Sequence, residues 1–274
     1  MNELSGAVAR CRPNCTPLCR SFKSDYGMSL FVPHRRFDTN QPELIDQPGV
    51  DQALLREELQ ILENFNQRLG GHRLMLHYVK QLVHSIETAS LSILDLGTGA
   101  ADIPRAIVTW ARQRQLSIVV TAVDGNPEVL QIARESCRSW PEIRFEQHDL
   151  RALPYARESF DLVLCSLALH HFDSADAITI LQRIHALARR GYIVNDLCRN
   201  WLAIWSTELL TRTLVQSPIF HNDAVQSCRA AFTVRELRAM AKRAGLSGFQ
   251  IKHHHALLRM VLLGKNEELS RPQN

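Results

Sequence analysis

The sequence has no long apolar run and little excess charge, and these absences exclude several classes of protein. Of its 274 residues, 45% are hydrophobic and 22% are charged, which is ordinary for a globular chain and unlike a disordered or collagen-like one. No apolar stretch approaches the roughly 20 residues that span a bilayer, and none follows the early arginines as in a secretory signal. We therefore expect a cytoplasmic protein without stable membrane insertion.

The small positive charge is confined to one end of the chain. The net charge is +4, from 32 basic and 28 acidic residues, and residues 1–36 alone hold six bases and two acids. The remaining residues carry 26 of each sign, so the main body has no positive field that would attract a nucleic acid. Three prolines and the lack of any sustained period indicate that residues 1–36 are a poorly ordered basic leader. Translation that starts at Met28 would explain it, and we expect the leader to be dispensable.

The seven cysteines lack the pattern of a disulfide framework. Four are scattered through the body, as reduced core thiols are: Cys137, Cys165, Cys198 and Cys228. The other three, Cys11, Cys15 and Cys19, have a spacing that resembles the cluster loop of radical enzymes. That loop ends in a two-residue gap, however, and here prolines interrupt the segment. We expect no metal or cluster there.

Two helices are predicted ahead of the main domain. Apolar residues recur at three- and four-residue intervals from Leu54 to Phe65, and Gly70-Gly71 ends this helix. A second helix is predicted from about residue 72 to 86. We assign residues 37–89 to an N-terminal helical cap, residues 90–266 to the main domain and residues 267–274 to a tail.

Short apolar runs alternate with helical stretches after residue 90, which is typical of a parallel sheet with helices on both faces. Strands are predicted near 91–96, 117–123, 143–147, 160–166, 192–196, 249–252 and 257–264, and the intervening helices near 101–114, 127–138 and 175–188. The predicted fold is α/β, a doubly wound and mostly parallel seven-stranded sheet. Ligands of such sheets bind beyond the carboxyl ends of the strands.

A tight turn rich in small and acidic residues follows the first predicted strand. Asp95 ends that strand, and Gly97 and Gly99 bracket the turn, where side chains would keep a ligand from the backbone. A dinucleotide fingerprint would read G-x-G-x-x-G, but Asp102 occupies the place of the third glycine. Its charge would repel a pyrophosphate, so the turn suits a cationic ligand.

Four segments together resemble class I S-adenosylmethionine-dependent methyltransferases, over roughly residues 91–266. Asp95-x-Gly97-x-Gly99-x-Ala101 is similar to the first motif of that family, in which the last small residue is often glycine. The segments 123–126, 147–150 and 160–172 match the later motifs in order and spacing. The resemblance implies a Rossmann-like methyltransferase fold.

The same resemblance implies S-adenosylmethionine as the cofactor and gives individual residues a role. In the family, an acid at the place of Asp124 grips the two ribose hydroxyls, and a polar residue at the place of Asp149 lies beside the adenine amino group. Residues 69–74 are similar to a segment that caps the cofactor's methionine end in quinone-biosynthesis methyltransferases. There Arg73 either pairs with the methionine carboxylate or is a solvated residue at a helix boundary. The expected cofactor-binding residues are Arg73, Asp95, Gly97, Thr98, Gly99, Ala101, Asp102, Asp124, Gly125, Asn126, Asp149, Leu150 and Ser166.

Absent motifs and an insertion limit the methyl acceptor. No Asn/Asp-Pro-Pro-aromatic motif follows the fourth strand and no Pro-Cys nucleophile occurs, which argues a second time against nucleic acid. An insertion at about 197–232 contains an apolar helix near 201–215, which either covers the acceptor pocket or packs only on the core. As a lid it would favour a small apolar or aromatic acceptor.

Histidines are the candidate catalytic bases, because they exchange a proton near neutral pH. His170 and His171 follow the fourth strand, and His221 lies in the insertion. The run at 253–255 is interpreted as a connection between two strands, and we expect no metal site.

We therefore predict an enzyme, a monomer or homodimer, that transfers a methyl group to a phenol, quinol or polyketide-like enol, with oxygen slightly favoured over carbon. The alternatives are an NAD(P)-dependent oxidoreductase and a non-catalytic module that keeps the cofactor-binding fold.

Overall fold

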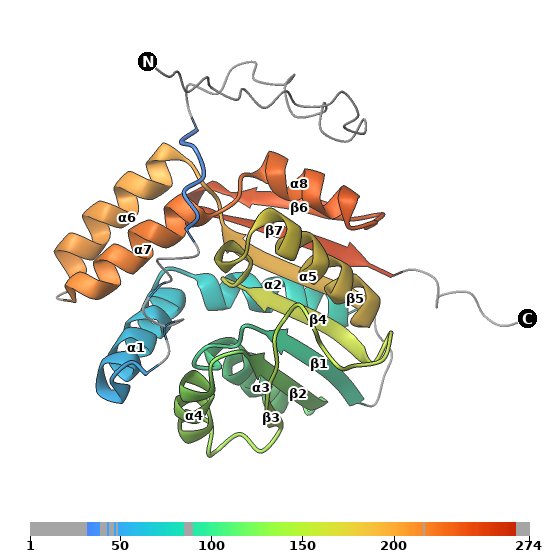
Figure 1. Ribbon diagram of the computed structural model, residues 1–274. Coiled ribbons are helices and arrows are strands. Elements are labelled where there is room, and N and C mark those ends of the chain that lie inside the picture. The colour runs from blue at the N-terminus through green and yellow to red at the C-terminus, as the bar shows by residue number, and fades with distance from the viewer. Residues whose placement is uncertain are drawn as a thin grey trace, which may run out of the picture.

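A seven-stranded sheet forms the centre of the protein (Figure 1). The structure is a computed structural model that describes residues 32–38, 43, 47, 49–84, 90–215 and 217–266. The strands follow the order β3-β2-β1-β4-β5-β7-β6, and only β7 runs antiparallel to its neighbours. Their bounds are β1 (Ser90–Leu96), β2 (Ser117–Asp124), β3 (Ile143–Gln147), β4 (Phe160–Ser166), β5 (Ala188–Leu197), β6 (Gln250–His254) and β7 (Arg259–Lys265). The predicted doubly wound, mostly parallel sheet is confirmed.

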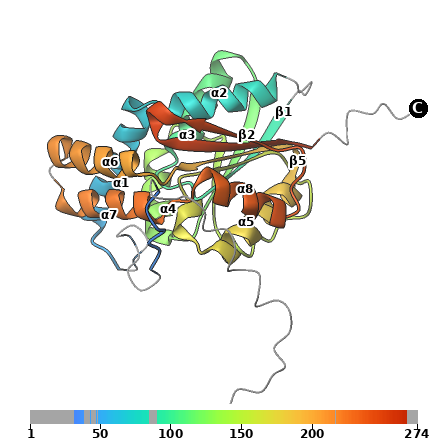
Figure 2. The ribbon, with the colours of Figure 1, turned by 90° about the horizontal axis from the view of Figure 1, so that it is seen from above.

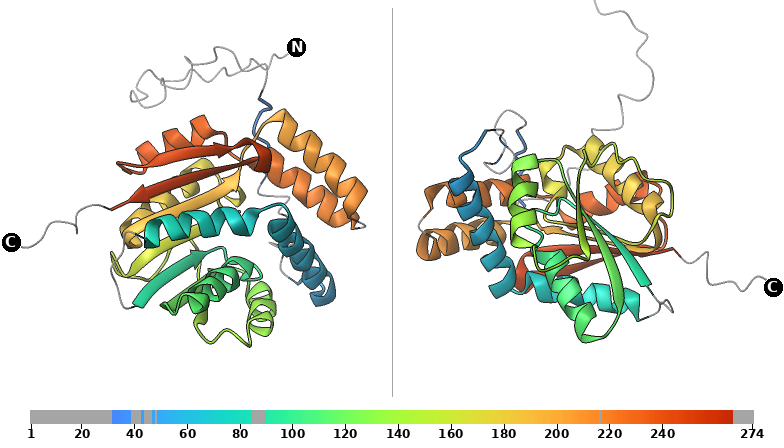
Figure 3. Two further views of the ribbon diagram at one scale, coloured as in Figure 1. Left: turned by 180° about the vertical axis from the view of Figure 1, so that it is seen from behind. Right: turned by 90° about the horizontal axis from the view of Figure 1, so that it is seen from below.

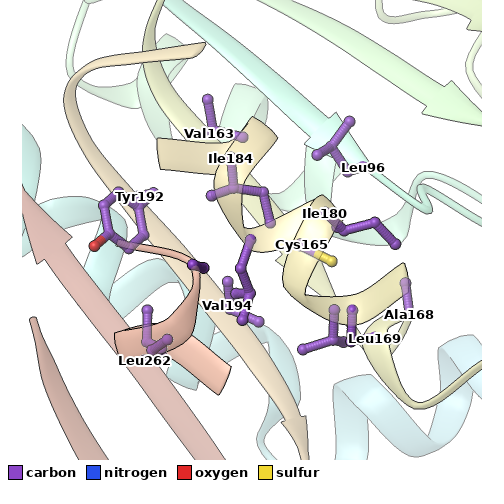
Figure 4. Packing of buried hydrophobic residues seen from close by; sticks show 14 of the residues in the cluster. Leu96, Val163, Cys165, Ala168, Leu169, Ile180, Ile184, Tyr192, Val194 and Leu262 are labelled. Atoms are coloured by element: carbon purple, nitrogen blue, oxygen red, sulfur yellow. The ribbon is translucent and has the colours of Figure 1, made fainter. Parts of the chain in front are cut away.

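The central strands are apolar along nearly their whole length because helices cover both faces of the sheet. In β4, five consecutive residues are buried, and β1 and β2 show almost the same pattern. One face packs against α2 (Gly71–Val83), α3 (Asp102–Gln113) and α4 (Pro127–Ser136). The other face packs against α5 (Ser174–Leu187) and α8 (Val234–Arg243), with Tyr192, Ile184 and Leu262 in the shared core (Figures 2 and 4). The strand order reverses between β1 and β4, which is where such sheets bind ligands.

Side-chain caps fix where the helices near that edge begin. Asn126 accepts hydrogen bonds from the amides of residues 128 and 129 at the start of α4, and Asp173 caps α5 in the same way. Thr233 and Glu236 form the capping box that the sequence predicts for α8. These caps hold the loops that precede the helices in place at the ligand-binding edge.

Three helices gather beyond the carboxyl ends of the parallel strands (Figures 1 and 3). They are α1 (Gln52–Arg68), α6 (Trp201–Leu214) and α7 (Pro218–Ala230). α1 packs through Leu55 and Leu59 on Val129 and Ile132 of α4. α6 and α7 share a small core of their own, formed by Ile204, Val225 and Cys228.

α6 does not turn its apolar face inward, as the prediction of an apolar roof would require. Trp201, Leu202, Trp205, Leu209 and Leu214 are 44–67% exposed. The inner surface of this helical pair comes mainly from α7, which the sequence analysis did not identify as a helix. The insertion therefore lies where we predicted, but a different helix lines its underside.

The predicted leader ends earlier than residue 36. Residues 32–38 lie against the body: the Arg36 amide donates to the Arg229 carbonyl, and the Arg199 guanidinium donates to the Pro33 carbonyl. Arg35 stacks on the rings of Phe37 and Phe232. Residues 1–31 and 267–274, which include the remainder of the leader and the tail, lie outside the described residues.

The other compositional expectations have simple outcomes. Cys137, Cys165, Cys198 and Cys228 are buried free thiols. None of the described helices has the length and apolar character needed to cross a bilayer. The histidine run is not a plain connection, because His253 and His254 belong to β6 and only His255 lies in the short helix η4 (His255–Leu257).

Candidate active site

A cavity of about 610 Å³ opens at the carboxyl edge of β1, β2 and β4. It is lined by eleven of the thirteen predicted cofactor-binding residues: Asp95, Gly97, Thr98, Gly99, Asp102, Asp124, Gly125, Asn126, Asp149, Leu150 and Ser166. These residues come from four different strand ends, which the parallel sheet brings to one edge. We call it the cofactor cavity.

The turn after β1 is shaped by backbone conformations that favour glycine. Gly97 has a φ of +67°, and a Cβ there would lie 2.5 Å from the Cβ of Ala168. Ala101 is also left-handed, with a φ of +57°, at the position where the resembling family often has glycine. Alanine is tolerated there at a conformational cost of about 1–2 kcal/mol. Ala101 is fully buried and shapes the turn without lining the cavity.

Asp124 is held in a fixed orientation at the end of β2. Its Oδ2 accepts a hydrogen bond from the Gly99 amide at 3.0 Å, and its Oδ1 accepts one from the Asn126 amide at 3.0 Å. The carboxylate thereby ties the turn after β1 to the turn after β2. Both bonds come from backbone donors, which fix the orientation of the carboxylate.

Two further acids stand at the base of the cavity. Asp102 Oδ2 accepts a hydrogen bond from Asn66 Nδ2 at 3.0 Å and lies 2.7 Å from His72 Nε2. Asp95 is 2% exposed, and burial raises its pKa to about 7. A cationic ligand next to these carboxylates would favour their charged form.

The structure does not place Arg73 in the cofactor cavity. Its side chain is exposed and borders a shallow pocket together with His77 and His254. The neighbouring residue His72 is the one that turns towards the cavity wall, where it meets Asp102. Successive helical residues point about 100° apart, so the predicted pairing with a cofactor carboxylate misses by one position.

A second cavity, of about 180 Å³, lies beneath α7 and beside α1. Its walls are largely apolar, with Phe65, Leu210, Phe220 and Leu257 among them. Three residues line both this cavity and the cofactor cavity: Leu62, Leu167 and His171. We call it the acceptor cavity, and its junction with the cofactor cavity is the place where two ligands would meet.

An acid–base cluster lies at this junction. His170 is buried in the short helix η3 (Leu169–His171), with Nδ1 2.6 Å from Asp196 Oδ1, and its amide donates to Asp196 Oδ2 at 3.0 Å. The carboxylate of Glu43 lies beside both rings, 3.9 Å from His170 Nε2 and 3.8 Å from His171 Nε2. Ser227 of α7 donates a hydrogen bond to Glu43. Within the described residues, this is the set of side chains whose spacing would suit a metal ion.

Arg35 fastens the turn that carries these histidines. Its guanidinium donates to the carbonyls of His170 and Phe172, at 3.2 and 2.7 Å, and to the carbonyl of Ala230 at 2.6 Å. Burial lowers its pKa to about 10, so it remains cationic at neutral pH. The segment predicted as a leader therefore supports the candidate base.

His221 does not belong to this cluster. It lies on α7 but faces α6, with Nδ1 2.6 Å from Thr211 Oγ1, and it lines neither cavity in the described part of the chain. The side of α7 that faces the acceptor cavity carries Phe220, Ala224 and Ser227 at helical spacing. The structure therefore gives His221 no place at the junction of the two cavities.

The sequence analysis assigned no role to several polar residues at or beside the two cavities. Asn66 and Asp196 are buried partners of Asp102 and His170, and Glu43 and Arg259 line the acceptor cavity. Asp196 follows β5 directly, so the rule that ligands bind beyond strand ends could have found it. The other three have no local signal, because they lie in a helix, in a segment without period and at the start of an antiparallel strand.

Comparison with known proteins agrees with this architecture. Residues 93–191 match the family model described as a methyltransferase domain. The matched segment contains the turn after β1 and both histidines of η3, and the match favours the methyltransferase prediction over the oxidoreductase alternative.

The similar proteins differ widely in what they are reported to act on. A demethylmenaquinone methyltransferase of Thermus thermophilus is 32% identical over 112 residues, 40% of this chain and 48% of its own length. Human N-acetylserotonin methyltransferase in complex with S-adenosylmethionine has a TM-score of 0.59 at 16% identity, over 83% of this chain and 63% of its own. The plantazolicin methyltransferase BpumL with S-adenosylhomocysteine has a TM-score of 0.56 at 16% identity, over 78% of this chain and 95% of its own.

The matches to curated relatives span only part of those proteins. The aligned segments cover 32% to 48% of the relatives' lengths. The family model matches the segment that forms most of the cofactor cavity, whereas α6, α7 and the terminal strands lie beyond the matched residues.

Proposed function

We propose that this methyltransferase transfers the methyl group of S-adenosylmethionine to an acidic hydroxyl of a small apolar acceptor, such as a phenol, quinol or enol. The observation that carries the proposal is the place of His171, which lines both cavities at their junction. Transfer in line requires the two reactants to meet end to end, and a base beside the meeting point can take the acceptor's proton.

The cofactor cavity fits S-adenosylmethionine in its donor chemistry and in its shape. Asp124 offers a fixed carboxylate for the ribose hydroxyls, and Asp95 and Asp102 offer negative charge for the ammonium and sulfonium groups. A Cβ on Gly99 would have no protein atom within 4 Å, so its absence leaves room for a ligand. Asp149, beside Arg151, would lie at the adenine end.

The chain's own residues would then prepare the acceptor. S-adenosylmethionine supplies an electrophilic methyl group on its sulfonium. His171 takes the hydroxyl proton at a ring nitrogen, and Glu43 stabilises the imidazolium that results. His170, held by Asp196, fixes the position of the cluster. The new oxygen–carbon bond replaces the sulfur–carbon bond, and the proton leaves His171 for solvent after the product departs.

The size of the acceptor cavity limits the acceptor. A cavity of about 150 Å³ lined by apolar side chains holds one benzene molecule. At about 180 Å³, the acceptor cavity fits one substituted ring or a short enol and excludes a polynuclear compound or a nucleotide. The cavity volume therefore favours an acceptor with a single ring, and we keep oxygen as the favoured nucleophile.

The proposal is tested by transfer of a labelled methyl group to single-ring phenols and quinols. Wild-type protein and Asp124→Ala are compared, and calorimetry with S-adenosylhomocysteine and with NAD reports on the cofactor. We expect transfer by the wild type, none by Asp124→Ala, and binding of S-adenosylhomocysteine alone. Tight binding of NAD without S-adenosylhomocysteine would refute the proposal, and cofactor binding without any transfer would favour a non-catalytic module.

A further inference from the structure

Arg259 is a buried cation on the wall of the acceptor cavity. It is the first residue of β7, where it pairs with Leu197 of β5 and His254 of β6. Because β7 runs against the other strands, its first residue lies at the edge where the parallel strands end. The side chain is 8% exposed and lines the acceptor cavity, not the cofactor cavity.

This cation has few partners within the protein. Among the described residues, Arg259 makes one hydrogen bond, from Nη2 to Asn66 Oδ1 at 2.8 Å, and no carboxylate lies within 4.0 Å of it. Its Nη1 is fully buried and has no hydrogen-bond partner. The carboxylates of Asp102 and Asp196 favour its charged form from a distance, and Asn66 links it to Asp102. Neither carboxylate contacts the guanidinium, so a buried donor is left for a further acceptor.

The N-terminus of α2 adds to the positive electrostatic potential around Arg259 Nη1. A Cβ on Gly71 would lie 2.8 Å from Nη1, so the guanidinium touches the first turn of α2. Gly70, the N-cap of that 13-residue helix, offers no side chain to its free amides. The positive end of a helix and a guanidinium that face one another both attract an anion.

Two acids on the same cavity wall, Glu43 and Glu58, already have other partners. Glu43 accepts a hydrogen bond from Ser227 and faces the two histidines. Glu58 accepts one from Ser217 at 2.6 Å, and burial raises its pKa. Neither acid forms an ion pair with Arg259 within the described residues.

We infer that Arg259 binds an anionic group of the methyl acceptor, a carboxylate or a comparable acidic group other than the hydroxyl that is methylated. This inference rests on the proposed function and narrows its substrate class to single-ring hydroxy acids. The guanidinium fork gives two parallel donors to a carboxylate. The apolar remainder of the cavity accommodates the ring.

The experiment compares two probes that differ only in charge, a hydroxybenzoate and the matching hydroxybenzamide. Calorimetry is done on full-length protein saturated with S-adenosylhomocysteine. Wild-type protein is expected to bind the benzoate at least about 10-fold more tightly, the ratio that one charged hydrogen bond provides. Arg259→Met is expected to reduce that ratio to about one, and Arg73→Met, which removes an exposed arginine outside both cavities, is expected to leave it unchanged.

A second variant guards against a failure to fold. Arg259→Gln keeps an amide donor for Asn66, and circular dichroism confirms which variants are folded. Equal binding of both probes by wild-type protein would overturn the inference, and so would a folded Arg259 variant that keeps the preference. A fall of S-adenosylhomocysteine affinity of 10-fold or more in these variants would also overturn it, because it would assign Arg259 to the cofactor.

The same titrations separate this inference from the proposed function. If wild-type protein does not bind S-adenosylhomocysteine, the proposed function fails whatever the probes do. If it binds S-adenosylhomocysteine and transfers methyl groups but shows no preference for the benzoate, only the inference about Arg259 fails.

Discussion

The cofactor cavity and the acceptor cavity meet at His171, yet they are built in opposite ways. The cofactor cavity takes most of its polar lining from turns that directly follow β1, β2, β3 and β4. The acceptor cavity combines α1, η3, α6, α7, the start of β7 and Glu43. The first is a property of short sequence segments, and the second exists only once distant elements have packed. A substitution in the cofactor cavity should therefore change cofactor affinity or stability, whereas a substitution beside the acceptor cavity should change kcat.

Replacing His171 should produce the largest effect. We expect His171→Gln to lower kcat by about 10²–10⁴, the usual contribution of a general base, with the affinity for S-adenosylhomocysteine unchanged. His221→Gln is the matched control and should retain wild-type kcat, because His221 faces α6. Steady-state kinetics with any acceptor that the wild type methylates measures both. Equal losses in the two variants would mean that the junction does not contain the base.

The turn after β1 should be sensitive in stability. Gly97→Ala places a Cβ 2.5 Å from Ala168, whereas Gly99→Ala meets no atom within 4 Å, although both residues have positive φ. The conformational strain of about 1–2 kcal/mol is common to both variants. Overpacking should lower the unfolding free energy of Gly97→Ala by about a further 1–3 kcal/mol. Urea denaturation without ligand measures this difference in unfolding free energy. Equal stabilities would show that Ala168 moves aside without a measurable cost.

The contact between residues 32–38 and the histidine turn should matter for catalysis and not for cofactor binding. Arg35→Ala removes the donors to the carbonyls of His170 and Phe172, so His171 loses its exact placement. We expect kcat to fall about 10-fold, because displacements of about 1 Å cost at least that much. Arg36→Ala is the control, because it removes an exposed side chain and keeps the hydrogen bond from the amide of residue 36 to the Arg229 carbonyl. A reduced affinity for S-adenosylhomocysteine in Arg35→Ala would contradict the separation of the two regions.

Asp95 should give the smallest effect on ligand affinity, together with a dependence of stability on pH. Burial raises its pKa to about 7, so the folded protein without ligand holds a proton that the unfolded chain releases near pH 4. The unfolding free energy should therefore fall as the pH rises from about 4 to about 7. Affinity for the cationic cofactor should instead rise a few-fold between pH 6 and 8, as the carboxylate forms. Asp95→Asn should flatten both curves, and unchanged curves would assign them to another group.

The same contrast explains how far the sequence could predict the molecule. The strands, their parallel order and the acids at their ends depend on local patterns that occupy adjacent residues, so β1–β5 and most of the cofactor cavity were predictable. Ala101 was placed in the right turn, but its left-handed backbone and complete burial depend on packing. The sequence thus predicted which segments form the site more reliably than it predicted the conformation of single residues within them.

The errors have a common physical origin in helix rotation. His72, next to Arg73, contacts the cavity residue Asp102, and Phe220, next to His221, lines the acceptor cavity. One step along a helix turns a side chain by about 100°. The apolar residues of α6 gave no sign of which face would be covered, because α7 was not recognised beside it. Glu43 and Arg259 could not be linked from the sequence, since only the complete sheet with its surrounding helices brings them to one cavity.

The place of β7 at the end of the sequence also determines the order in which the two cavities are synthesised. During synthesis, the turns that form the cofactor cavity are complete once α5 has emerged. The acceptor cavity then still lacks α7 and Arg259, and the contact between Arg35 and Phe232 cannot yet form. The segments that form the cofactor cavity are thus synthesised well before those that close the acceptor cavity.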